Sequence, residues 1–360
     1  MNSKIAILII CFSIFSCIHK SQRTVAEQPE DQIVNENLRP HEDRETETIV
    51  TSAITEMIDY TPLNLKIRAG YSMEKDELNG CVIYLQGLGD SIRNHRPYFK
   101  FLNTAGYRII YFDYMGQGGS EGDMSDTTIQ VQLPINATKE MRRKYAVDKY
   151  RDIPEMADFV WSKYQSVTNH RGQNCLQSKK LVIGWSTGGL AAYRMAHEHR
   201  ADAVILLAPG IHPKLMVGAA AGFSNWIKIF SNDIITEKSL TRNNFEHELN
   251  PHLDPIKPTS PLQVKRFAGN LIGVARDAQQ WIIKDTINPP HHVEGLVFLS
   301  GAEDTYVDRD KTIETLEKNA KDFKYFSYDG ALHELDNELP KVSDDIYQKS
   351  VEFLNQASSR

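Results

Sequence analysis

The residues best suited to chemistry in this chain are a serine, an aspartate and a histidine, each of which follows an apolar run. Ser186 lies in Gly184-Trp185-Ser186-Thr187-Gly188, where the apolar run Leu181–Ile183 leads through a turn into helix-forming residues. A turn of this kind pushes the serine hydroxyl out above the edge of a sheet, and the flanking glycines leave room for it. Such a hydroxyl attacks a carbonyl carbon once a base takes its proton. The alternative is a serine that only caps the helix beginning near Thr187.

An acid and a base follow two later strands. Asp304 follows one predicted strand in Ser300-Gly301-Ala302-Glu303-Asp304, and His333 follows the final strand in Asp329–His333. The order Ser186, Asp304, His333 is the order of nucleophile, acid and base on a parallel α/β scaffold. His333 is then the base and Asp304 orients it. Glu303 and Asp308 are rivals for the acid, and a turn or capping role is the alternative for Asp304.

A tetrahedral intermediate also needs donors for its oxyanion, generally two backbone N–H groups. The residue after the nucleophile, Thr187, supplies one of them. The glycine-rich loop Gln86–Gly89 follows another apolar run, and we expect Leu88 in it to supply the second.

The elements that must position these residues alternate between strand and helix, which predicts an α/β fold with a mostly parallel, doubly covered sheet. Two antiparallel strands between Ile49 and Tyr71 are expected at one edge. The later predicted strands are 81–85, 107–112, 181–183, 203–208, 296–300 and 323–328. The predicted helices are 98–105, 148–164, 188–199, 310–320 and 344–355.

Composition and motifs exclude several other classes of protein. The chain has 360 residues and a net charge of −6, which gives no electrostatic reason to expect nucleic acid as a partner. The loop Gly116–Gly122 begins like a dinucleotide fingerprint, but Glu121 stands where the third glycine is needed. We expect no cofactor and no metal site.

The N-terminus resembles an export signal. Residues 1–17 contain Lys4, then an apolar stretch of eleven residues from Ile5 to Phe15, and then Ser16-Cys17. A stretch of eleven residues is shorter than the roughly 20 that span a bilayer. The ending resembles a lipobox, which predicts lipidation of Cys17 and a membrane-tethered lipoprotein of a bacterial cell envelope. Signal cleavage nearby or an uncleaved anchor are the alternatives. The polar residues 18–47 are predicted to form a flexible tether.

The remaining cysteines suit an oxidising compartment. With Cys11 removed and Cys17 lipidated, only Cys81 and Cys175 are left. Both lie near predicted strands that could be neighbours, so a disulfide between them is one alternative and two free thiols are the other. Two cysteines without clustered histidines do not make a zinc site.

Four stretches together resemble the α/β-hydrolase superfamily, in its branch of monoacylglycerol lipases, lysophospholipases and S33-like serine aminopeptidases. They are Gln86–Gly89, Phe112–Ser120, the Ser186 turn, and the segments of Asp304 and His333. The resemblance spans about residues 50–355, although Gln86 and Gln117 replace histidines usual in the family. It implies a core at 48–208 and 295–360 and a helical cap at 209–294.

The resemblance implies a serine hydrolase that cleaves a lipid-like carboxylic ester, of the monoacylglycerol or lysophospholipid type, through an acyl-enzyme. A peptidase or amidase is the alternative within enzymes, because the same triad cleaves amides. A catalytically silent binding lipoprotein is the alternative of another class, and the intact Ser–Asp–His set argues against it. The apolar stripe in Leu215–Phe230 of the cap could line an acyl groove, contact a membrane or pack on the core.

Overall fold

The computed structural model describes most of the chain after residue 52. The described ranges are 53–62, 64–87, 90–115, 117–121, 153–212, 214, 240–243, 293–320 and 322–359, with the backbone of 233–235 and 263–265. By its contacts the chain divides into two units, Met1–Glu47 and Thr48–Arg360. The predicted signal segment, Cys17 and the tether lie outside the described residues, and so does most of the predicted cap.

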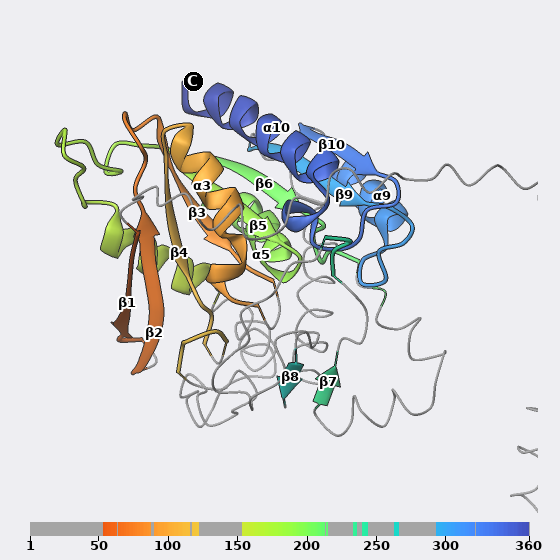
Figure 1. Cartoon of the computed structure of the whole chain (residues 1–360), viewed down its shortest axis with the longest axis horizontal. Coiled ribbons are helices and arrows are strands. Elements are labelled where there is room, and N and C mark those ends of the chain that lie inside the picture. Colours follow the sequence, from red (N-terminus) through yellow and green to blue (C-terminus); the bar gives the residue numbers. More distant parts are fainter. Residues whose placement is uncertain are drawn as a thin grey trace, which may run out of the picture. The chain divides into compact units, whose positions relative to one another are not determined.

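An eight-stranded sheet forms the frame of the second unit (Figure 1). Its strand order is β1-β2-β4-β3-β5-β6-β9-β10. The strands are β1 (Ala53–Tyr60), β2 (Leu65–Ser72), β3 (Gly80–Leu85), β4 (Tyr107–Phe112), β5 (Lys180–Trp185), β6 (Ala203–Leu207), β9 (Glu294–Ser300) and β10 (Phe323–Tyr328). β1 pairs antiparallel with β2, and β2 with β4, whereas all other neighbours are parallel. The α/β prediction and the antiparallel edge pair are both confirmed.

The inner strands are mostly apolar because helices cover both faces of the sheet. In β3, Cys81, Ile83 and Leu85 belong to one core, and Val82 and Tyr84 belong to the other. The first core is covered by residues 153–164, α5 (Thr187–His197) and α9 (Arg309–Asn319). The second is covered by α3 (Arg96–Thr104) and α10 (Pro340–Ser359), which Figure 1 shows on the same side of the sheet.

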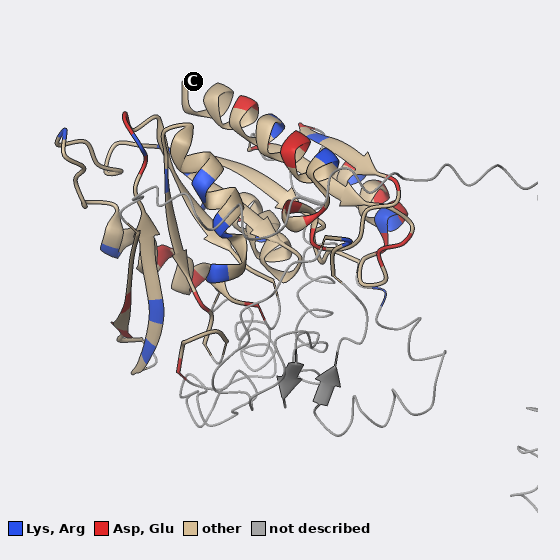
Figure 2. Ribbon diagram, in the orientation of Figure 1, with Lys and Arg blue, Asp and Glu red and all other residues tan. Residues whose placement is uncertain are grey.

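The observed bounds differ from the predicted ones mainly at helix ends. α10 is longer than the predicted 344–355 at both ends, because Pro340 suits a first helical turn and Ser350, Leu354 and Ala357 continue its buried stripe. Acidic and basic positions are mixed along α10 (Figure 2), where Lys349 pairs with Asp345 one turn away. None of the helices that the structure describes has the length and apolar character needed to cross a membrane.

The described residues also include two short turns and a separate two-stranded sheet. Two 3-10 turns, η1 (Ile92–His95) and η2 (Leu335–Asn337), flank the ends of β3 and β10 in sequence. Within the predicted cap, β7 (Asp233–Ile235) and β8 (Gln263–Lys265) pair antiparallel, a short sheet that the sequence patterns do not predict. The apolar stripe of the cap lies outside the described residues.

A disulfide joins Cys81 of β3 to Cys175, which precedes β5. The two cysteines are 94 residues apart in the chain, but β3 and β5 are paired neighbours, and this pairing brings the sulfurs together. Both side chains are buried. Of the two alternatives that the sequence left open, the structure contains the bridged one.

Candidate active site

Ser186 lies at the sharp turn between β5 and α5. Its backbone has φ 52° and ψ −114°, a conformation that residues other than glycine rarely adopt. Its N–H donates to the carbonyl of Leu207 at 2.9 Å, which holds the turn against β6. The Ser186 side chain makes no capping hydrogen bond to α5. The strained turn therefore presents the hydroxyl for a use other than the capping alternative.

The glycines around Ser186 are required by close backbone packing. A Cβ on Gly184 would lie 2.2 Å from the carbonyl oxygen of Gly188, and a Cβ on Gly188 would lie 2.0 Å from that of Leu85. Both distances are far below van der Waals contact. The G-x-S-x-G spacing thus lets β5, the start of α5 and the end of β3 meet at one point.

The structure brings Ser186, His333 and Asp304 together from three strand ends. His333 Nε2 lies 2.8 Å from Ser186 Oγ, and His333 Nδ1 lies 2.9 Å from Asp304 Oδ2. These partners assign the ring proton to Nδ1, which donates to the carboxylate, so that Nε2 accepts from the serine hydroxyl. His333 is 3% exposed and Ser186 is half-buried. This is the arrangement that a serine nucleophile and its base require.

Asp304 is held by donors on both carboxylate oxygens. Ser300 Oγ donates to Oδ2, and the N–H groups of Tyr306 and Val307 donate to Oδ1 at 2.7 and 3.1 Å. Burial alone would raise the pKa of Asp304, but His333 and these hydrogen bonds outweigh it and lower the pKa to about 2. Asp304 is therefore ionised throughout the neutral range.

The two rivals for the acid make other contacts. Glu303 is exposed, and its Oε2 accepts from the N–H of Gly330 at 3.2 Å. Asp308 caps α9, where its Oδ1 accepts from the N–H of Lys311 at 3.1 Å. Of the three acids, only Asp304 contacts His333.

Aromatic rings hold the His333 imidazole in place. The Tyr306 ring lies 4.8 Å from it between centroids, and the Trp185 ring lies 5.5 Å from it. Trp185 Nε1 also donates to the backbone carbonyl of His333 at 3.0 Å. No motif in the sequence relates Tyr306 or Trp185 to His333, or Ser300 to Asp304, so the sequence does not predict these contacts.

The expected oxyanion donors are only partly described. Thr187 is the first residue of α5 and directly follows Ser186, so its N–H lies at the N-terminus of that helix. Leu88 lies outside the described residues. Gln86 is fully buried, and its carbonyl accepts from the Tyr114 hydroxyl at 2.8 Å. Its side-chain amide has no hydrogen-bond partner in the described part of the chain.

Comparison with known proteins agrees with this geometry. Residues 76–340 match the sequence pattern of the family described as serine aminopeptidase, S33. The chain belongs to this family. The resemblance stated from the motifs is confirmed, and it covers well over half of the sequence.

Two solved structures illustrate the fold of this S33 member. A soluble variant of the monoglyceride lipase from Saccharomyces cerevisiae, in complex with a substrate analogue, is 16% identical, with a TM-score of 0.61 over 87% of this chain and 97% of that one. The monoacylglycerol lipase of Paleococcus ferrophilus is 18% identical, with a TM-score of 0.52 over 81% of this chain and 99% of that one. No curated protein matches the chain.

In this S33 family member, the buried side chain of Asp113 anchors the loop after β4. Asp113 is buried, and its Oδ2 accepts from Arg68 Nε and from the N–H of Gly119 at 2.9 Å. Its Oδ1 accepts from the N–H of Ile92 at 3.0 Å. Burial raises the pKa of Asp113, and Arg68 offsets only part of that effect. One buried carboxylate thus links the loops that follow β3 and β4.

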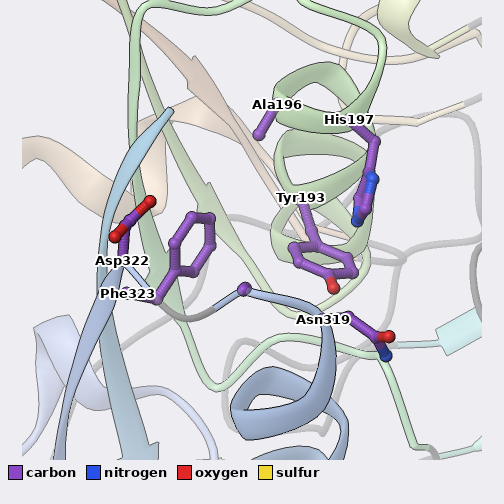
Figure 3. Close-up of a pocket in the computed structure, with 7 residues that line it drawn as sticks. Tyr193, Ala196, His197, Asn319, Asp322 and Phe323 are labelled. Carbon is purple, nitrogen blue, oxygen red and sulfur yellow. The ribbon is translucent and has the colours of Figure 1, made fainter. Parts of the chain in front are cut away.

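A small pocket lies away from the Ser186 site. It is formed between the end of α5 and the α9–β10 connection, where Tyr193 and His197 face Phe323 and Asn319 (Figure 3). Tyr193 and His197 make an edge-to-face contact at 4.7 Å, and Tyr193 and Phe323 another at 6.0 Å. None of the residues that line the pocket belongs to the Ser186, His333 and Asp304 set, so we assign it no part in the chemistry.

Proposed function

We propose that the chain is a serine hydrolase that cleaves carboxylic esters of lipid-like alcohols through an acyl-enzyme. The observation that carries this proposal is the continuous array of Ser186 Oγ, His333 and Asp304, with contacts of 2.8 and 2.9 Å. Such an array converts a weakly nucleophilic hydroxyl into one that attacks a carbonyl.

In the first half-reaction, Ser186 Oγ attacks the ester carbonyl carbon while His333 Nε2 takes the hydroxyl proton. The tetrahedral intermediate places its negative charge on the former carbonyl oxygen, where the N–H of Thr187 is the expected donor. The bond to the alcohol oxygen then breaks, and His333 returns the proton to that oxygen. The alcohol leaves and the acyl group remains on Ser186.

In the second half-reaction, water attacks the acyl carbon and gives its proton to His333. Collapse of the intermediate breaks the bond between the acyl carbon and Ser186 Oγ, His333 gives its proton to that oxygen, and the acid leaves. The ionised Asp304 stabilises the imidazolium that forms in each half-reaction. Because the pKa of Asp304 is about 2, it keeps this negative charge at every pH at which the ester chemistry is expected to run.

The lipid-like substrate is supported by the fold neighbours, two of which are described as monoglyceride or monoacylglycerol lipases. The family description supports a second candidate, hydrolysis of amides by a peptidase. The alcohol of an ester is a better leaving group than the amine of an amide, so ester cleavage depends less on protonation of the leaving group by His333.

Labelling with a fluorophosphonate probe tests the nucleophile. The wild type should be labelled and Ser186→Ala should not, because the probe bonds to an activated serine oxygen. Ser162→Ala is the matched control, since Ser162 is an exposed serine on the helix of residues 153–164. Equal labelling of wild type and Ser186→Ala would refute the assignment.

A substrate panel tests the leaving group. We expect turnover of short p-nitrophenyl esters with at least a burst, turnover of monoacylglycerols or lysophospholipids, and no turnover of aminoacyl anilides. Preference for the anilides would favour the peptidase. Labelled protein that turns over none of these substrates would contradict the lipid-like ester.

We also propose that the protein is exported and tethered through lipid on Cys17. The support is the apolar run Ile5–Phe15 that ends in Ser16-Cys17, and the polar residues that follow it. In a bacterial host the wild type should incorporate labelled palmitate and fractionate with membranes, whereas Cys17→Ser should do neither. Equal distribution of the two proteins would contradict the anchor.

A further inference from the structure

A second histidine, His95, lies between two carboxylates in the interior. Its Nε2 is 2.6 Å from Asp90 Oδ2, and its Nδ1 is 2.5 Å from Asp336 Oδ2. The hydroxyl of Tyr84 also lies 2.9 Å from Nδ1. All four side chains are fully or almost fully buried. No motif in the sequence singled out this cluster.

The contacts make His95 a positively charged bridge. Both ring nitrogens face carboxylate oxygens, and an imidazole donates from both nitrogens only when it is protonated. Burial by itself would lower the pKa of His95, but Asp336 and Asp90 outweigh it and raise the pKa well above the usual value. Asp90 is further held by the N–H of Ser91 and by Asn94 Nδ2, each at 2.7 Å.

A metal ion is the other use to which this cluster could be put. His95, Glu334 and Asp336 offer ligand atoms that all lie within 4.8 Å of one another. A metal ligand needs a free lone pair on a ring nitrogen, however, and both nitrogens of His95 are engaged with carboxylates. Glu334 in turn accepts from Asn337 Nδ2 at 2.8 Å. The cluster is therefore better described as a hydrogen-bonded bridge.

The bridge connects two segments that border the Ser186 site. Asp90 lies at the start of the segment that leads from the loop after β3 into η1, and Asp336 lies three residues after His333. A second link runs parallel to it, because Asn337 Nδ2 also donates to the carbonyl of Asn94 at 2.9 Å.

Trp185 couples the bridge to the chemistry. Its ring lies 5.5 Å from the His95 ring and 5.5 Å from the His333 ring, and its Nε1 donates to the His333 carbonyl. Trp185 is also the residue directly before Ser186 and is fully buried. A shift of the bridge therefore moves neighbours of both the nucleophile and its base.

We propose that His95 is a positioning residue: by joining Asp90 to Asp336, it holds the segment of His333 in register with the turn of Ser186. The inference rests on the proposed serine hydrolase function. A buried ionic bridge is a weak source of stability, because desolvation offsets most of the attraction between its charges. Its directional hydrogen bonds can nevertheless fix a distance, and misplacement of a catalytic group by about 1 Å costs about 100-fold in rate.

Two substitutions at Asp336 separate positioning from stability. Asp336→Asn keeps a side-chain oxygen that accepts from His95 Nδ1, so kcat should stay within about 3-fold of the wild type. Asp336→Leu has a similar size and no acceptor, and kcat should fall by about 10- to 100-fold with KM nearly unchanged. Both values are expressed per active site, counted by fluorophosphonate labelling, at a temperature at which each variant is folded.

A buried ion pair at the opposite end of the sheet is the matched control. Arg108 and Glu74 are both buried and bonded at 3.0 Å, and Arg108 is the second residue of β4, far from the strand ends that carry the site. Glu74→Leu should lower the Tm at least as much as Asp336→Leu, and it should leave kcat per labelled site unchanged.

The outcomes distinguish the bridge from the function on which it rests. A wild type that the probe does not label overturns the serine hydrolase, whatever the Asp336 variants do. A labelled wild type with equal kcat in Asp336→Leu overturns the bridge alone, and so does a loss of kcat in Glu74→Leu as large as that in Asp336→Leu. If Asp336→Leu does not fold, His95→Gln is judged by the same criteria, since both N–H groups of a Gln amide are on one nitrogen, whereas the two carboxylates face different nitrogens of the His95 ring.

Discussion

Removal of the Cys81–Cys175 disulfide should destabilise the protein strongly without altering its chemistry. The perturbation is the double substitution Cys81→Ala and Cys175→Ala. Both sulfurs are buried, and they link β3 to the segment before β5. Cys81 is the second residue of β3, whereas the Ser186 site lies beyond the last residue, Leu85. Loss of the disulfide therefore acts on the end of the sheet opposite the Ser186 site.

The expected loss of stability follows from the length of chain that the disulfide closes into a loop. For residues 94 apart, the chain-entropy relation gives a loss of about 15.6 cal/mol/K in the unfolded state, or about 4.7 kcal/mol at 25 °C. This value is an upper bound, because residual structure in the unfolded chain already lowers its entropy. It is comparable to the total free energy of unfolding of a domain of low stability, which is about 5 kcal/mol.

Urea unfolding of the wild type and the double variant measures this difference. We expect the midpoint to fall by an amount that corresponds to about 3–5 kcal/mol. The kcat per labelled Ser186 should stay within about 2-fold below the transition. Thiol titration of the denatured wild type is the control, and it should detect neither Cys81 nor Cys175. Titration of both as free thiols, or a loss of stability below about 1 kcal/mol, would refute the reasoning.

Two further predictions concern the site. The pKa of Asp304 is depressed from its ordinary 3.8 to about 2, so its contribution of about 2 kcal/mol is present above pH 4 and lost as the pH falls through 2. In urea unfolding between pH 2 and 5, Asp304→Asn should lack this part of the acid dependence, and an unchanged pH slope would contradict it. Gly188→Ala should abolish folding or probe labelling, because its Cβ would lie 2.0 Å from a backbone oxygen. Gly172→Ala, with open space around the Cβ and only a positive φ to strain it, should retain both, at a cost of about 1–2 kcal/mol.

Much of the fold follows from local sequence patterns. The strands β4 and β10 begin and end at the predicted residues, because both are rich in the aromatic and β-branched residues that favour strands and both stop where polar and glycine residues begin. The turn of Ser186 is equally local, since Gly184 and Gly188 are required by contacts within a few residues of Ser186 or with the adjacent strand. The ends of helices depend more on tertiary packing than on local sequence. The last turns of α10, for example, depend on packing against the sheet.

The sequence by itself determined the fold class, the family and the order of Ser186, Asp304 and His333, because each depends on residue types at short spacing. Only the tertiary structure decided that Asp304 faces the imidazole while Glu303 and Asp308 turn elsewhere. It also decided that Cys81 meets Cys175 and that His95, which lies next to Asp90, contacts Asp336 at a separation of 241 residues. Hydrogen bonds and disulfides between distant segments form only when the distance between the two atoms is correct to within a few tenths of an ångström. Those distances are set by the packing of the whole sheet and its helices, which no local pattern contains.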